Sequence, residues 1–240
     1  MPAKPVERRI TDLVARGIAA KVLSVLLSDP DPVTRDYLKR SASKELDRAT
    51  NLVAEGSRVR TDITNLRRVL SGLNAEALPT LLAKAAAPPY ETEYGMAHVF
   101  MKVQTMADVA GFYRAFGLDF AAGGRERPDH LAAEFEFLHF LLLMQASALV
   151  DGRRTEFLAV RRAETTFLRE HLGAWGPAYL DKVATFDPDS AAARVAHVAA
   201  RFVQTESRRL RVTARRALPV QNPQPAPETE RELCEPKSPS

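Results

Sequence analysis

The chain has 240 residues, a formal net charge of +4 and a hydrophobic fraction of 45%, which suits a globular protein with a real core. Its single cysteine, Cys234, excludes a disulfide framework and a cysteine metal site, and a reducing, cytoplasmic setting is expected. The charge is unevenly spread. Residues 88–137 hold eight acidic and four basic side chains, a local net charge of −4, so the remainder carries +8. An acidic middle with basic ends gives the molecule an oriented electric field.

The first predicted element is an amphipathic helix over residues 10–25. Arg8 and Arg9 precede apolar residues, a pattern superficially like a twin-arginine export signal. Arg16 and Lys21 interrupt the apolar stretch, however, and no small-residue cleavage site follows, so we expect no signal peptide. The apolar residues recur at helical spacing up to "SDPDP" at residues 28–32, where a turn is predicted. No uninterrupted apolar run reaches the ~18 residues of a membrane span, and no membrane insertion is expected.

The remaining segments also favour helices, with turn signals between them. The pattern predicts a helix over 33–55, another over 56–73, a break at Pro79, a loop over 87–95 and a helix over 106–116. Gly117 is expected to stop this last helix in a left-handed conformation, with Leu118 folding back on it.

The C-terminal part predicts two further helices and then a change of composition. The helices are expected around 153–171 and 190–216, with "GAWGPAYLDKVATFDPD" between them. Proline and charge then replace core residues. The fold class is therefore all-α: one globular helical domain over residues 1–217, followed by a disordered proline-rich tail over residues 218–240.

The stretch "RPDHLAAEFEFLHFLLLMQA" (127–146) predicts a helix that is apolar on nearly every face, which belongs at the centre of a domain. Pro128 and Asp129 are expected to open it, because proline tolerates the first turn and a carboxylate suits the positive helix end. A cationic His130 is disfavoured in that turn, so a neutral imidazole is expected. The start of this helix must reach the surface and carry Asp129 and His130 to a rim.

The same stretch also contains the residue types of a metal or catalytic cluster. Glu136 and His139 form a Glu-x-x-His pair, but the second such motif of a di-iron bundle is missing from the sequence. His139 is better explained as a core or boundary histidine with a hydrogen bond. Asp129 and His130 are adjacent and cannot easily form a relay to a nucleophile, and no Gly-x-Ser-x-Gly elbow occurs. We therefore expect no metal site, no catalytic residue, no cofactor and no enzymatic activity.

Three blocks in this order, "PPYETEYG", "MADVAGFYRAFGL" and "ERPDHLAAEFEFLHFLL", resemble the TorD/DmsD/NarJ family of molybdoenzyme maturation chaperones. The resemblance runs from about residue 13 to 171 and more weakly to 216. It is closest to the subgroup serving enzymes for ethylbenzene, dimethyl sulfide, chlorate or selenate. The resemblance implies a cytoplasmic, cofactor-free helical chaperone. Its partner would be the molybdopterin-containing catalytic subunit, bound through its twin-arginine leader and apo body to assist cofactor insertion and delay export.

The resemblance also implies a binding site. Its positions fall on a loop and on the start of the central helix: Pro89, Tyr90, Glu91, Glu93, Tyr94, Asp129 and His130. Tyr90 stands where relatives often have tryptophan. The hypothesis is that Glu91, Glu93 and Asp129 contact the basic part of the leader, while the two tyrosines hold its apolar helix. The hypothesis requires the loop and the helix start to converge on one surface.

A second interpretation is a basic helical nucleic-acid-binding or regulatory module. It rests on the arginines of "ESRRLRVTARRA": Arg208, Arg209, Arg211, Arg215 and Arg216. No recognition motif accompanies them, so stable nucleic-acid binding is not expected. The sequence leaves a monomer and a homodimer equally open.

Overall fold

The computed structural model describes residues 5–29, 31–73, 88–94, 99–118 and 127–213 of the chain. Nine α-helices and one short 3-10 helix occupy these ranges: α1 (Pro5–Leu27), α2 (Pro32–Arg40), α3 (Ala42–Leu52), α4 (Arg58–Ser71), η2 (Glu91–Glu93), α5 (Val99–Ala115), α6 (Leu131–Val150), α7 (Arg154–Glu170), α8 (Leu172–Phe186) and α9 (Ala191–Arg209). The predicted all-α fold is confirmed. The predicted break at Pro79 and the predicted tail at 218–240 lie outside the described residues.

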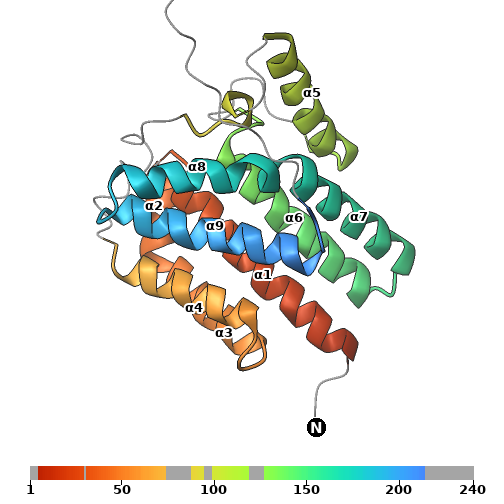
Figure 1. Ribbon diagram of the computed structural model, residues 1–240. Helices are drawn as coiled ribbons and strands as arrows, with labels where there is room; N and C mark the ends of the chain where they lie inside the picture. Colours follow the sequence, from red (N-terminus) through yellow and green to blue (C-terminus); the bar gives the residue numbers. More distant parts are fainter. Residues whose placement is uncertain (1–4, 30, 74–87, 95–98, 119–126, 214–240) are drawn as a thin grey trace, which may run out of the picture.

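Helices α1 and α6 pack against each other along their length and form the centre of the fold (Figure 1). Gly17 permits this close approach, because a Cβ atom there would lie 3.2 Å from the Leu143 side chain. The Gly17 carbonyl accepts a hydrogen bond from Nδ1 of His139 at 2.8 Å, as expected for a boundary histidine. In the part of the chain that the structure describes, α6 alone is long and apolar enough to cross a membrane, but 56% of its apolar window is buried.

The other helices surround this pair. Helices α3 and α4 cover one side of α1, and α7 packs beside α6. Helices α8 and α9 lie side by side across the centre, with α9 also contacting α4 (Figure 1). Helix α5 stands apart at the top of Figure 1 and is attached through aromatic rings, including those of Tyr113 and Phe137, whose centroids are 4.6 Å apart.

Several predicted boundaries are right. The first helix ends where "SDPDP" begins, and Asp31 caps α2 by accepting from the Thr34 N–H at 2.7 Å. Gly117 has a φ of +73°, and the N–H of Leu118 reaches back to the Tyr113 carbonyl at 3.0 Å, which is the predicted left-handed stop.

Three predicted elements are wrong in part. The helix expected over 33–55 breaks at Ser41 into α2 and α3. Residues 172–186, expected only as a connection, form the helix α8, which tolerates Pro177 because buried rings anchor it. Helix α9 ends at Arg209, before the predicted 216, because Arg211 turns left-handed with a φ of +56° and the Val212 N–H bonds back to Ser207.

A buried ion cluster joins helices α1, α7, α9 and α6. Arg16 is fully buried and donates to Glu206 at 2.8 Å and to Glu164 at 2.8 Å. Arg209 also donates to Glu164 at 2.8 Å, and Gln145 donates to its second oxygen at 2.8 Å. Burial alone would raise the pKa of Glu206, but Arg16 and Arg209 outweigh burial and hold it below its usual value. The cluster fixes how four helices meet.

Replacing Arg16 with methionine is expected to lower the free energy of unfolding by about 3–5 kcal/mol, because two buried carboxylates lose their main partner. The loss should shrink as the pH falls, since protonation of Glu206 removes its ionic contribution in the wild type and relieves the unpaired charge in the variant. Urea denaturation measures both effects. Arg40→Met is the control, because Arg40 pairs with Asp36 on the surface. This substitution should lower the free energy of unfolding by about 1 kcal/mol or less.

Candidate functional site

The loop before α5 and the start of α6 are joined by main-chain hydrogen bonds. Tyr90 and His130 form an isolated antiparallel bridge. The Glu91 N–H donates to the Asp129 carbonyl at 2.9 Å, and the Leu131 N–H donates to the Pro89 carbonyl at 2.9 Å. Two segments about forty residues apart in sequence therefore converge on one surface, as the docking hypothesis requires.

The Asp129 side chain links the loop to the residues just before α6 through hydrogen bonds. Its carboxylate is fully buried and accepts from the Thr92 hydroxyl at 2.8 Å and from Arg127 at 2.8 and 2.9 Å. The loop is thereby tied to the residues just before α6. Asp129 was expected to help open the helix and to contact the leader. Its carboxylate instead accepts hydrogen bonds from these internal partners and has no exposed surface.

His130 caps α6 instead. Its Nδ1 accepts a hydrogen bond from the Ala132 N–H at 3.1 Å, so this nitrogen carries no proton, as expected for a neutral imidazole. The His130 ring packs edge-on against the Tyr90 ring, with centroids 5.2 Å apart. The Arg127 guanidinium lies over the same Tyr90 ring, 4.5 Å from its centroid. The half-buried Arg127 and Tyr90 therefore cover His130, which is 4% exposed, and the predicted placement of Asp129 and His130 at a surface rim is wrong.

Tyr94 lies in the core, with 1% of its surface exposed. Its ring contacts Trp175 and Tyr179 on α8 at centroid distances of 5.3 and 5.8 Å. Burial raises the pKa of Tyr94 to about 12. The residue anchors the end of the loop and offers a partner no direct contact in this conformation.

Two buried glutamates, Glu91 and Glu134, lie beneath this surface. Glu91 lies 3.1 Å from Nδ1 of His171, and Glu134 accepts from the Trp175 indole N–H at 3.0 Å. The two carboxyl groups also hydrogen-bond each other. Burial, and then the charge of Glu91, raise the pKa of Glu134 well above its usual value. Burial likewise raises the pKa of Glu91, although His171 opposes the shift.

The predicted site residues therefore divide into two groups. Pro89, Tyr90 and Glu93 are half-buried and reach the surface, with Glu93 paired to Lys102 at 2.8 Å. Four others lie inside and hold the surface in shape: Glu91, Tyr94, Asp129 and His130.

An acidic groove of about 690 Å³ lies beside this loop, between α5 and the end of α7. Its lining includes Glu91, Asp108, Gly111, Phe112, Glu170 and His171. Asp108 and Glu170 are exposed carboxylates, and the sequence offered no spacing that connects them. The groove combines negative charge at its rim with the flat ring of Phe112.

The arginines of the basic segment do not act as one face. Arg209 is turned toward the buried glutamates Glu164 and Glu206, while Arg208 lines a different groove on α9. Arg215 and Arg216 lie outside the described residues. This division weakens the electrostatic footprint that a nucleic acid would need.

The described residues hold no group of three or more histidine, cysteine, aspartate or glutamate side chains placed to bind a metal ion. His139, the candidate ligand of the Glu-x-x-His pair, instead bonds to the Gly17 carbonyl. Burial lowers the pKa of His139, which favours its neutral form.

The fold and the site together define an all-helical protein with a loop-and-helix surface supported by buried carboxylates. A family model described as "Nitrate reductase delta subunit" matches residues 59–181, just over half of the chain. The chain belongs to this family, which is the TorD/NarJ family that its motifs resemble.

Curated relatives agree with this family. The perchlorate reductase assembly chaperone protein of Dechloromonas aromatica (strain RCB) is 44% identical over 70 residues, 29% of this chain and 30% of the relative. The selenate reductase assembly chaperone protein of Thauera selenatis is 38% identical over 82 residues, 34% of this chain and 42% of the relative. The chlorate reductase assembly chaperone protein of Ideonella dechloratans is 37% identical over 78 residues, 32% and 39% of the two chains.

In each case the chain matches less than half of the relative's length. The three names belong to the predicted subgroup, and none of them denotes an enzyme, in agreement with the expectation that this chain is not a catalyst.

The buried glutamate pair predicts an unusual pH dependence. Because the folded protein holds the Glu134 proton more tightly than the unfolded chain, the free energy of unfolding should fall as the pH rises above about 4.5. Glu134→Gln keeps an acceptor for Trp175 without the charge, so its stability should fall less over the same range. Thermal unfolding followed by Trp175 fluorescence measures this. Glu136→Gln, on the exposed face of α6, should leave the wild-type slope unchanged.

Proposed function

We propose that this chain is a cytoplasmic assembly chaperone for the catalytic subunit of a molybdopterin-dependent reductase. It binds the client's twin-arginine leader and unfinished body, assists cofactor insertion and delays export until maturation is complete. Membership of the family and the names of the three relatives support the class of function. The observation that carries leader binding is the acidic groove beside the loop of Pro89 and Tyr90.

The chemistry of this groove suits a guanidinium group. Asp108 on α5 and Glu170 at the end of α7 both line the groove with exposed carboxylates. Their present partners, Gln104 at 2.8 Å and Arg169 at 2.9 Å, are themselves exposed side chains. Carboxylates bind the planar fork of arginine through paired, charge-assisted hydrogen bonds. The Phe112 ring in the same groove offers a flat surface on which a guanidinium stacks. The apolar helix of the leader would then continue over the half-exposed Tyr90 and Pro89.

The predicted site residues take different roles in this arrangement. Tyr90, Pro89 and Glu93 contact the leader directly. The four buried residues act as positioning residues, because they fix the loop against α6 and α8: Glu91, Tyr94, Asp129 and His130. Loss of a positioning residue would weaken binding by releasing the loop, without removing a contact to the leader.

Removing the two carboxylates of the groove tests this directly. The double variant Asp108→Asn/Glu170→Gln is expected to bind the client's leader peptide about tenfold more weakly, a loss of about 1.4 kcal/mol, measured by calorimetry. A leader peptide with both arginines replaced by lysine should bind the wild-type protein more weakly, because lysine lacks the planar fork of arginine. The double variant should lose little further affinity for this lysine peptide.

Glu55→Gln provides the matched control, since Glu55 is an exposed acid far from the groove, with 91% of its side chain accessible. It should leave affinity unchanged. Equal affinity of the wild type and the double variant for the leader would remove the acidic groove from the site. Failure of the wild type to bind any leader while it still binds the apo subunit would restrict the function to the client body.

A further inference from the structure

A second and larger groove, of about 1330 Å³, opens between α4, α8 and α9, on a part of the molecule that the leader site does not use. Its floor consists of small residues that let a polypeptide backbone approach: Gly173, Ala174, Ala178, Ala196 and Ala200. Gly173 cannot be enlarged, because a Cβ atom there would lie 2.1 Å from the Leu168 carbonyl oxygen. The groove therefore has room over a closely packed pair of helices.

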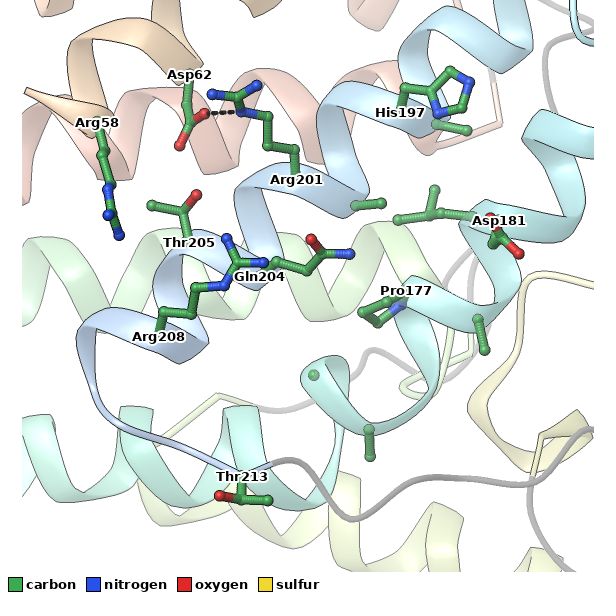
Figure 2. Close-up of a pocket in the computed structure, with 16 residues that line it drawn as sticks. Arg58, Asp62, Pro177, Asp181, His197, Arg201, Gln204, Thr205, Arg208 and Thr213 are labelled. Atoms are coloured by element: carbon green, nitrogen blue, oxygen red, sulfur yellow. Dashed lines mark hydrogen bonds and ion pairs between the residues drawn. The ribbon is translucent and has the colours of Figure 1, made fainter.

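Positive charge is concentrated at one end of this basic groove. Arg58, Thr205 and Arg208 gather toward that end, while His197 and Asp181 lie toward the other (Figure 2). The Arg58 and Arg208 side chains are exposed, and in the described residues neither is engaged in a hydrogen bond or an ion pair. Arg201 is different, because Asp62 binds it at 2.9 Å. Two uncommitted guanidinium groups beside a hydroxyl suit a ligand that carries several carboxylates.

The chain itself contains such a ligand. Thr213, the last described residue, lines the basic groove, and 27 residues follow it. Within them, the segment "ETERELCE" (228–235) carries four glutamates and one arginine, Arg231. The fourteen residues between Thr213 and Glu228 can span up to ~45 Å when extended, and the linker starts at a residue that itself lines the groove. Four prolines in residues 219–227 restrict that linker and lower the entropy lost on docking.

We propose that the basic groove is a binding site for an acidic peptide segment and that its occupant is residues 228–235 of the same chain. The glutamates pair with Arg58 and Arg208. The opposite signs at the two ends favour a mixed-charge peptide over a small polyanion such as a nucleotide, which Asp62 and Asp181 would repel. A covalent linker of this length gives an effective concentration of about 1 mM, so even a weak contact is populated.

The chain offers its own probes for a test. Cys234 is its only cysteine and lies within the acidic segment, and Trp175 is its only tryptophan and lies on α8 beside the groove floor. Energy transfer from Trp175 to an acceptor dye on Cys234 of the full chain reports their separation. We expect high transfer at low salt and a clearly lower transfer at about 1 M salt, where the Debye length is about 3 Å and the released tail stays tethered only at Thr213.

Charge variants then identify the partners. Arg58→Glu/Arg208→Glu should abolish the transfer, as should Glu228→Lys/Glu230→Lys/Glu232→Lys, and combining the two sets should restore it. Arg35→Gln/Arg48→Gln, which changes two exposed arginines outside the groove, should leave it intact. Circular dichroism checks that each variant is folded.

Transfer that ignores both the groove arginines and salt would overturn the proposal. Transfer that falls when the protein is diluted would assign the occupant to a second copy of the chain, which also overturns the intramolecular proposal. If the tail shows no transfer but a separate acidic peptide of the client binds through Arg58 and Arg208, the groove belongs to the client and not to residues 228–235. No outcome depends on leader binding, so this test and that of the acidic groove fail separately.

Discussion

The main-chain bridge between Tyr90 and His130 is the constraint on which the site depends. A loop without regular structure becomes part of the fold because its N–H and C=O groups pair with the residues just before α6. Asp129 and Tyr94 then hold the two ends of the loop, one through a buried carboxylate and one through aromatic packing on α8. These contacts tie the loop to α6 and α8, and a loop that is ordered in the free protein loses less entropy on binding a partner.

Buried charge has a second role deeper in the molecule. A helical bundle with an apolar core can exchange helix pairings at little cost, since leucine, valine and alanine pack in many ways. Arg16 accepts only an arrangement in which Glu164 and Glu206 both reach it, so α1, α7 and α9 must meet in one register. We infer that this cluster contributes more to the specificity of the fold than to its net stability, because burial of the ions offsets much of their attraction.

Much of the fold followed from local patterns, while much of the site did not. The central helix was predictable because an apolar run on all faces belongs at the centre of a domain, but the prediction that its start carries Asp129 and His130 to a rim is wrong, since both residues are buried. Helix α8 was not predicted because Pro177, Gly173 and Gly176 are typical of a loop. The burial of Trp175 and Tyr179 outweighs that local preference. The roles of Asp129 and Tyr94 were misassigned for a related reason. Composition identified them as polar and aromatic, but only their tertiary partners place them inside.

The acidic groove shows the limit of sequence reasoning most clearly. Asp108 and Glu170 are 62 positions apart, and they face one cavity only because the rings of α5 dock onto Phe137 and Phe167. The basic groove arises in the same way from α4, α8 and α9. The two grooves of opposite charge meet at the first turn of α8, where His171 lines one and Gly173 lines the other. Glu91 binds His171 just before α8, so the loop beside the acidic groove and the helix that lines the basic groove share one buried contact. The close packing of Gly173 on Leu168 leaves this turn little free space, so the start of α8 is a tightly packed boundary between the two grooves.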